Sequence, residues 1–301
     1  MKKKNAETLR EPDTLSPLRL NIFEERNGDV ISGEFVSAGG RVFPINNGIP
    51  DFATPSHLTR GASFARDYYT KIAGTYDENL HITFDLYNED ELDARKSMIG
   101  LLHLKKDSKV LEISAGTGKD SAIIATELGG DGALWLLDIT PDMLEHAVGR
   151  MADVAVPVEF VVGTACALPF DDKTFDAVYC FAGIGHFPDI GKGLSEMARV
   201  VKPGGRVVFC EKNVPPWLRD TEYGKILTNN NPMFAYDAPL DLIPVNAINV
   251  GIRWIIGNAH YVVDYTVGEG EPEGKFDLEL PGERGGTFNT RYYGQLEGVT
   301  R

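Results

Sequence analysis

The sequence predicts an α/β protein: a doubly wound, mostly parallel sheet of seven strands with a small N-terminal β module. Apolar strand-like runs alternate with helix-like runs from residue 109 onward, which is typical of parallel strands joined by helices. Short β-prone runs broken by glycines fill residues 18–54. The stretch VLEISAGTGKD, residues 110–120, places glycines directly after a strand, which indicates a ligand-binding loop.

Composition sets limits on function. Of the 301 residues, 43% are hydrophobic and 25% are charged, which is ordinary for a folded protein with a sizeable core. The net charge is −14, from 44 acids against 30 bases. Such a surface repels phosphate backbones, so we expect no nucleic-acid partner.

The cysteines and apolar runs indicate the compartment. Cys166, Cys180 and Cys210 form no CxxC pair, which argues against a disulfide framework or a cysteine zinc site and favours a reducing cytoplasm. The lysines after Met1 are not followed by an apolar stretch, so we expect no secretory signal. No run of about 18 apolar residues occurs, so we expect no membrane span and no membrane partner.

The first hundred residues divide into three parts. Residues 1–17 are polar and are expected to be a flexible N-terminus. Residues 18–54 are expected to form the β module, with strand-like runs at 29–36 and 40–45 and a turn at 46–50. An aromatic-rich helical segment at 62–78 and an amphipathic helix from Leu92 to Leu104 follow.

The alternation after residue 109 supplies the large sheet. Strands are expected at 109–113, 133–138, 158–162, 175–181, 205–211, 259–267 and 290–299. Helices are expected at 120–128, 140–151 and 192–201. Thr140 and Pro141 give the second of these helices an N-cap and a proline at its first position. The segment 213–257, rich in Pro, Asn, Asp and aromatic residues, interrupts the rhythm and is expected to form a cap.

Three ligands compete for the glycine loop. A P-loop would need GxxxxGK[ST], and this loop lacks that spacing. A nicotinamide site prefers GxGxxG; Gly116 and Gly118 fit, but Ser121 stands at the third position. S-adenosylmethionine has no phosphate but has a cationic sulfonium and an amino-acid end, for which an acid at the end of the first strand, here Glu112, is useful.

Downstream residues favour the third ligand. Asp138 ends the second strand, where a carboxylate can accept both hydroxyls of a ribose. Asp138 fits a nicotinamide site and an S-adenosylmethionine site equally. The stretch VGTACALPFDDKTFDAVYC at 162–180, followed by MARVVKPGGRVVF at 197–209, discriminates better between these two ligands. With these motifs, roughly residues 64–211 resemble class I S-adenosylmethionine-dependent methyltransferases, in the branch that includes ubiquinone and menaquinone C-methyltransferases.

The resemblance implies a Rossmann-like methyltransferase domain at residues 60–301, an enzyme that methylates a small-molecule acceptor, and a set of cofactor contacts. Glu112, Ser114, Ala115, Gly116 and Gly118 would face the methionine end of the cofactor. The ribose would be held by Asp138, the adenine by Ile139, Met143, Thr164 and Ala165, and the sulfonium would lie near Phe181 and Ala182. Ser114 and Thr164 depart from the family pattern, which often has Gly and usually has Asp at these two places.

The N-terminal module has a resemblance of its own. VISGEFVSAGGRVFPINNGIPDF, residues 30–52, looks like the small zinc-ribbon domain that precedes some bacterial methyltransferase domains. In that family paired cysteines bind zinc, whereas here Ser37 and neighbouring glycines stand at those places. We therefore expect a metal-free module held by its own strand pairing.

Candidate catalytic and substrate residues lie around the predicted ligand edge. In the resembling family the segment that carries Tyr69 and Tyr76 closes over the cofactor. His186 follows the fourth strand and Glu211 ends the fifth, so either is a candidate base if the acceptor must lose a proton. The cap contributes the aromatic residues Trp217, Phe234, Tyr236 and Trp254, which are expected to enclose the acceptor.

Other interpretations stay open. The cap could instead cover a dimer interface, and a homodimer is possible. The chain could be an RNA-directed methyltransferase, since some of these carry an N-terminal zinc ribbon, although the acidic charge and absent cysteines argue against it. It could also be a regulatory protein that binds S-adenosylmethionine and transfers nothing.

Overall fold

The computed structural model describes residues 1–53, 58–282 and 285–299, with side chains to residue 295. The large sheet consists of β5 (Lys109–Ile113), β6 (Ala133–Asp138), β7 (Val158–Val162), β8 (Phe175–Phe181), β9 (Val201–Lys212), β10 (Ala247–Ile255) and β11 (His260–Val267). Its order is β10-β11-β9-β8-β5-β6-β7. Strands β5 to β9 are parallel to one another, whereas β11 pairs antiparallel with both β9 and β10. The predicted fold class is confirmed.

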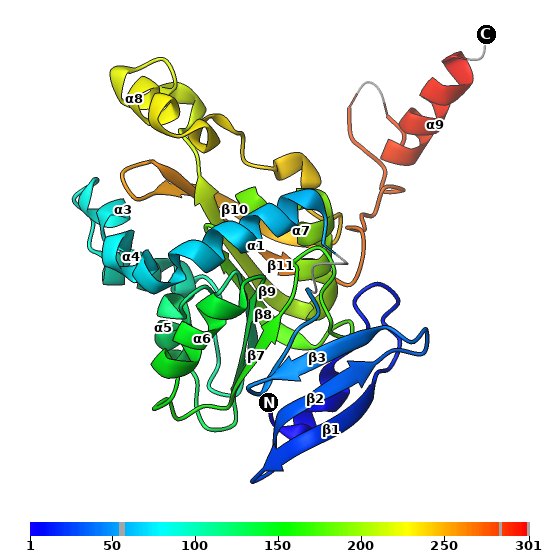
Figure 1. Ribbon diagram of the computed structural model, residues 1–301. Helices are drawn as coiled ribbons and strands as arrows, with labels where there is room; N and C mark the ends of the chain where they lie inside the picture. Colours follow the sequence, from blue (N-terminus) through cyan, green and yellow to red (C-terminus); the bar gives the residue numbers. More distant parts are fainter. Residues whose placement is uncertain (54–57, 283–284, 300–301) are drawn as a thin grey trace.

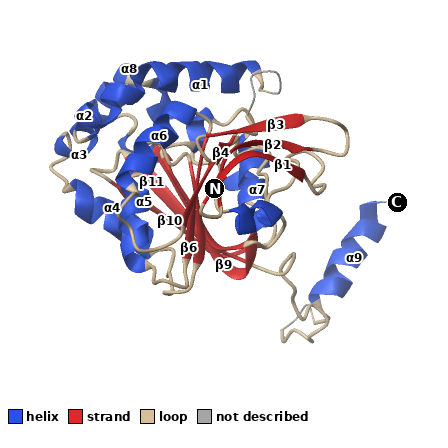
Figure 2. Cartoon of the chain, turned by 60° about the horizontal axis from the view of Figure 1, so that its bottom comes forward, coloured by secondary structure: helices blue, strands red, loops and turns tan. Residues whose placement is uncertain are grey.

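Helices cover both faces of this sheet (Figure 2). The α-helices of the described residues are α1 (Arg60–Ile72), α2 (Tyr76–Leu80), α3 (Ile82–Asp85), α4 (Glu91–Gly100), α5 (Lys119–Glu127), α6 (Pro141–Arg150), α7 (Ile190–Val200), α8 (Glu222–Asn230) and α9 (Phe288–Val299), of which α9 does not cover the sheet. Short 3-10 turns are η1 (Lys3–Thr8), η3 (Ala73–Thr75), η4 (Ile184–His186), η5 (Pro216–Leu218), η6 (Pro232–Ala235) and η7 (Leu240–Leu242). The predicted helix from Leu92 to Leu104 is α4, which is shorter than expected.

Strand β6 shows why both faces are covered. Leu134 and Leu136 pack with α4, α5 and α6, whereas Trp135 and Leu137 pack with α7 and the N-terminal module. Successive strand residues point to opposite faces, so a strand buried on both sides must be apolar throughout. The run ALWLL meets that requirement.

The N-terminal module is a four-stranded antiparallel sheet of β1 (Arg19–Arg26), β2 (Asp29–Val36), β3 (Val42–Asn46) and β4 (Ile49–Pro50). It lies beside β7, the edge of the large sheet (Figure 1). Phe35 and Phe43 belong to the same buried cluster as Trp135 and Phe170 of the large unit. Because so small a sheet cannot bury enough apolar surface alone, the module shares the core of its neighbour.

The first seventeen residues are not a flexible terminus, so that expectation is wrong. Leu9 is 1% exposed and forms a bridge with Phe170. The backbone N–H of Lys2 donates to Glu159 of β7 at 2.9 Å. The cause is local sequence: Ala6 in η1 and Leu9 directly after it are apolar, and the core of the large unit buries both.

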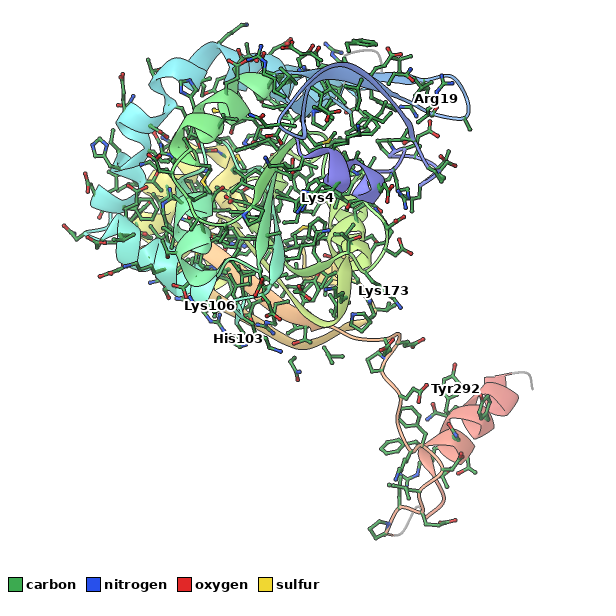
Figure 3. The ribbon with its side chains drawn as sticks, turned by 90° about the horizontal axis from the view of Figure 1, so that it is seen from below. Lys4, Arg19, His103, Lys106, Lys173 and Tyr292 are labelled. Atoms are coloured by element: carbon green, nitrogen blue, oxygen red, sulfur yellow. The ribbon has the colours of Figure 1, made fainter. Side chains whose placement is uncertain are left out.

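Two predicted features near the C-terminus are corrected. Residues 290–299 form most of helix α9 and not a closing strand, and Figures 1 and 3 show this helix, with Tyr292, standing clear of the sheets. The sixth strand is β10, which lies inside the segment predicted as a cap, so the connection between β9 and β10 is residues 213–246. A bulge between Ile248 and Gly251, with Asn249 at φ 53°, breaks the alternation of β10 and hid it in the sequence.

Two negative findings apply to the described residues alone. None of the helices seen there has the length and apolar character needed to cross a membrane. In the same ranges, no cluster of three or more His, Cys, Asp or Glu side chains could hold a metal ion.

Candidate functional site

A pocket of about 690 Å³ lies where β5, β6, β7 and β8 end. The carboxyl ends of parallel strands meet at one edge of a sheet, which is the usual ligand side of this architecture. Twelve of the predicted residues line it: Tyr69, Tyr76, Ser114, Gly116, Asp138, Ile139, Met143, Thr164, Ala165, Phe181, Ala182 and His186. Phe187, Pro188 and Ala65 also line it and were not predicted.

The glycine loop supplies the floor of the pocket. Gly116 has φ 53°, and a Cβ there would meet nothing within 4 Å, so its backbone is open to the pocket. Ser114 has φ 55°, a left-handed conformation that disfavours side chains. Gly118 lines neither pocket described here: a Cβ there would lie 3.1 Å from the Cβ of Ala147, so this glycine lets α5 pack against α6.

Asp138 stands at the end of β6 with both oxygens held by the backbone. The N–H of Gly116 donates to one oxygen and the N–H of Thr140 to the other, each at 2.9 Å. Burial raises the pKa of this carboxyl, and the two backbone donors oppose the shift. Each oxygen keeps a free lone pair, so the carboxylate can accept two adjacent hydroxyl groups.

The far wall is apolar with one hydroxyl. Ile139, Met143 and Ala165 contribute apolar side chains to it. The hydroxyl oxygen of Thr164 accepts from the N–H of Cys166 at 3.3 Å. Since that oxygen is already an acceptor, its hydrogen is available to donate to a ring nitrogen of a planar heterocycle.

A second pocket of about 340 Å³ adjoins the first and shares Tyr76, Ser114, Gly116 and Phe181 with it. Unlike the first pocket, it carries several charges, from Arg95, Glu112, Lys119 and Asp120. The predicted residues Glu112 and Ala115 line this pocket alone.

Arg95 is the central cation of the second pocket and was missed by the sequence prediction. Its Nη1 donates to Asp120 at 2.7 Å and its Nε to Glu91 at 2.9 Å. Its guanidinium lies over the rings of Phe84 and Phe181, at 5.2 and 4.9 Å from their centroids. A signal existed: Arg95 shares one helix face with the buried Met98, Ile99 and Leu102, and an arginine on an apolar stripe is rare without a partner.

Orphaned polar atoms mark the second pocket as a site for a charged ligand. Among the described residues, Arg95 Nη2 and Asp120 Oδ1 have no hydrogen-bond partner although both are buried. Burial, reinforced by Asp120, raises the pKa of Glu112, whose carboxyl accepts from the hydroxyl of Ser121. Buried polar atoms normally have partners, so a bound group with both an anionic and a cationic end fits here.

Tyr69, Tyr76 and His186 meet at the mouth of the first pocket. The hydroxyl of Tyr69 lies 3.1 Å from Nε2 of His186, with the two rings edge to face. Burial lowers the pKa of His186, opposed by Glu211, and burial raises the pKa of Tyr76 to about 12. A neutral imidazole and neutral phenols therefore line the mouth at neutral pH.

The remaining candidate base and the cap residues lie outside both pockets. Glu211 is 4% exposed and accepts from the N–H groups of Gly185 and Lys212, each at 2.9 Å, so it holds η4 from beneath. Trp217 and Tyr236 are exposed. Phe234 packs with Val214 and Ala259, and Trp254 lies on β10 and donates to Asn213. The structure does not bring these five residues to the pocket lining.

His260, for which the sequence offered no role, lies behind the wall that the pockets share. It is 1% exposed and its ring stacks on Phe181, with centroids 6.3 Å apart, and meets Phe234 edge to face. Neither ring nitrogen has a partner in the described ranges. Burial lowers its pKa to about 3, so the ring is neutral.

Comparisons with known proteins agree with this geometry. The chain is 36% identical to a demethylmenaquinone methyltransferase of Bacillus mycoides over 156 residues, which cover 50% of this chain and 63% of the relative. It is 33% identical to a demethylmenaquinone methyltransferase of Listeria monocytogenes over 154 residues, again 50% of this chain and 63% of the relative. The match therefore spans less than two thirds of the length of these relatives.

Solved structures share the fold at low identity. Phosphoethanolamine N-methyltransferase 2 of Haemonchus contortus, solved with S-adenosyl-L-methionine, gives a TM-score of 0.51 at 14% identity and covers 77% of this chain and 63% of that one. A second match is a chain of the complex between the Haloferax volcanii Trm112 methyltransferase activator and a methyltransferase. Its TM-score is 0.51 at 15% identity, and the match covers 69% of this chain and 99% of that one. These identities establish the fold alone.

The sequence profile of one family covers more than half of the chain, at residues 58–223. That range contains the glycine loop, Asp138, Arg95 and the Tyr69–His186 contact described above. The chain belongs to the ubiE/COQ5 methyltransferase family.

Proposed function

We propose that this chain transfers a methyl group from S-adenosylmethionine to a small-molecule acceptor. The observation that carries the proposal is the charge of the second pocket, beside the glycine loop. A dinucleotide or nucleoside triphosphate would place phosphates against this loop, where Glu112 and Asp120 would repel them. An amino-acid end, with one carboxylate and one ammonium, matches a pocket lined by the cations Arg95 and Lys119 and by two carboxyls.

The two pockets together suit the two ends of the cofactor. The free Nη2 of Arg95 would donate to the methionine carboxylate, and Asp120 or Glu112 would accept from the ammonium. Asp138 would accept the ribose hydroxyls, with Ile139 and Met143 against the adenine. The shared lining residues Ser114 and Phe181 then flank the passage between the two ends, where the sulfonium would lie.

The residues at the mouth have to position the acceptor and exclude water. S-adenosylmethionine supplies an already activated methyl group, so placement accounts for much of the rate. Tyr69 and Tyr76 close the mouth from α1 and α2. His186 is neutral and can hold a proton that the acceptor loses, which makes it the catalytic base of the proposal.

For the acceptor we propose a small quinone-like molecule in its reduced, hydroxyl-bearing form. The two relatives described above are named demethylmenaquinone methyltransferases, and the mouth of the first pocket is walled by the flat rings of Tyr69, Tyr76, Phe181 and Phe187. The four cap aromatics stay outside this proposal because their side chains line neither pocket.

Calorimetry on the purified chain tests the cofactor. S-adenosylhomocysteine should bind and NADH should not. Asp138→Ala should weaken that binding by about 1.5–3 kcal/mol, roughly ten- to a hundredfold. Asp176→Ala is the matched control, because Asp176 also accepts a backbone N–H, from Lys109 at 2.8 Å, but at the opposite edge of the sheet. NADH binding without S-adenosylhomocysteine binding would refute the proposal.

The acceptor has its own test. Incubation with methyl-labelled S-adenosylmethionine and a reduced demethylmenaquinone should give a labelled product by mass spectrometry. A phosphoethanolamine control should give none. Label on the control alone would keep the cofactor assignment and reject the quinone-like acceptor.

A further inference from the structure

The N-terminal module touches two walls of the first pocket at once. After β4 the chain runs beside β7: Asp51 bridges to Val162 in parallel, and the N–H of Phe52 donates to the carbonyl of Val162 at 2.8 Å. The next residues after Val162 are Gly163, Thr164 and Ala165, which line the pocket. Residues 51–53 therefore lie against the strand end that forms one wall.

The same segment also contacts a second wall of the pocket, through Arg66 of α1. Arg66 Nη2 lies 3.0 Å from Oδ2 of Asp51, and its Nη1 donates to the carbonyl of Ala53. Both side chains of the ion pair are largely buried, at 16% and 14% exposure. Ala65 and Tyr69, one residue before and three after Arg66, line the pocket from α1.

Residues 51–53 are themselves rigidly held. Phe52 is 4% exposed and its ring packs on Phe35 and Phe43 of the module, with centroids 6.0 and 5.0 Å apart. The second oxygen of Asp51 accepts from the N–H of Ala53 at 2.8 Å. The ring of Phe52 lies in the core of the module, and its backbone is bonded to the end of β7. The segment can therefore couple the position of the β7 wall to that of the α1 wall.

We propose that residues 51–53 are a strap that sets the width of the cofactor pocket, with Asp51 and Arg66 as positioning residues for Tyr69 and for the Gly163–Ala165 wall. This gives the N-terminal module, which lies outside the matched family range, a role in cofactor affinity. The inference rests on the proposed function for the identity of the ligand. The strap itself is a property of the fold.

The test compares two ion pairs that both join the N-terminal region to the large unit. Asp51→Asn and Arg66→Met should weaken S-adenosylhomocysteine binding roughly 5- to 50-fold, the usual range for coupling between sites. Arg66→Lys keeps the charge but loses the forked geometry, so it should fall between these variants and the wild type. Arg10→Met is the control, since Arg10 pairs with Asp171 at 2.6 Å away from the pocket lining.

A readout without ligand separates this inference from the proposed function. Hydrogen exchange should be faster in the amides of α1, residues 60–72, in Asp51→Asn than in Arg10→Met. If the wild type binds no S-adenosylhomocysteine, the proposed function fails while the exchange result still decides the strap. Unchanged affinity and unchanged α1 exchange in both strap variants would overturn the inference. An equal loss of affinity in Arg10→Met would also overturn it, because it would indicate general destabilisation.

Discussion

The two adjoining pockets are built in different ways. The larger one, about 690 Å³, is shaped by strand ends, the glycine loop and apolar side chains, with Asp138 held entirely by backbone donors. The smaller one, about 340 Å³, is shaped by an ion cluster in which Arg95 joins Asp120 and Glu91. They share a glycine-loop floor and the wall of Phe181.

This difference separates what backbone topology determines from what side chains determine. Strand ends arrive at one edge in any doubly wound sheet, so the larger pocket follows from the order of the strands. The smaller pocket depends on α4, which precedes the first strand and brings Arg95 to the loop from outside the alternation. Substitutions in the smaller pocket should therefore affect stability as well as ligand binding, whereas those in the larger pocket should mainly affect ligand binding.

The largest expected effect is Arg95→Met, which breaks the ion cluster. It leaves the 6% exposed side chain of Asp120 without its partner, and an unpaired buried charge costs about 3–5 kcal/mol of unfolding free energy. Urea denaturation measures it. Arg150→Met is the control, because its pair with Asp77 is a third exposed and should cost about 1 kcal/mol or less. Equal losses in both variants would show that the buried Arg95 cluster stabilises the fold no more than a partly exposed ion pair does.

Next in size is His186→Ala, at the mouth of the larger pocket. Turnover should fall by about 10²-fold, the lower end of what a general base supplies, while affinity for S-adenosylhomocysteine is retained. Tyr76→Phe should lower turnover less. His146→Ala, on an exposed position of α6, should change neither quantity. Loss of cofactor binding in His186→Ala would instead make this histidine part of the pocket wall.

The wall that the pockets share can be probed by pH through His260. The pKa of His260 is 6.5 in the unfolded chain and about 3 in the folded chain. Between these pH values the unfolded chain binds a proton that the folded chain does not bind. Unfolding free energy should therefore drop by about 1.4 kcal/mol per unit as pH falls below 6.5. His260→Phe keeps the ring stack and should remove that part of the slope in urea titrations at about pH 5 and pH 7. Identical slopes in the two proteins would show that the ring is solvated.

The smallest effect concerns Ser114, where the two pockets meet on the glycine loop. A residue with a Cβ is strained at the φ of 55° that Ser114 adopts, whereas glycine is not. Ser114→Gly should therefore raise the unfolding free energy by about 1 kcal/mol. Ala115→Gly should lower it by about 0.5–1 kcal/mol, because φ of Ala115 is not left-handed. Thermal denaturation of the two variants settles the sign; a loss in Ser114→Gly would mean that its hydroxyl contacts outweigh the strain.

The sequence predicts the larger pocket well because its residues follow strands. Asp138, Thr164 and Ala182 each come at or just after an apolar run, and parallel pairing brings such positions together regardless of what lies between them. The strand pattern alone predicts Asp138 at this edge, whereas Thr164 and Ala182 are predicted through the family resemblance; the identity of the ligand stays a proposal.

The cap and the smaller pocket were not predictable in the same way. Residues 213–246 have no regular strand, so whether Trp217 or Tyr236 faces a ligand depends on long-range packing. The bulge in β10 interrupts the alternation that would predict a strand. Tyr292 and Tyr293 have high β-propensity, so the sequence of α9 predicts a strand where the structure has a helix. Arg95 could have been found only by asking why a charge interrupts the apolar face of α4.

The contact of the N-terminus with β7 has a consequence for synthesis on the ribosome. The backbone of Lys2 bonds to Glu159, 157 residues later. At about 5–20 residues per second, roughly eight to thirty seconds separate the emergence of the two partners. During that interval the apolar face of the module, with Phe35 and Phe43, lacks the residues of the large unit that join its core in the folded chain. The nascent chain must therefore pass through a state in which its first folded strands are exposed to aggregation or to chaperones.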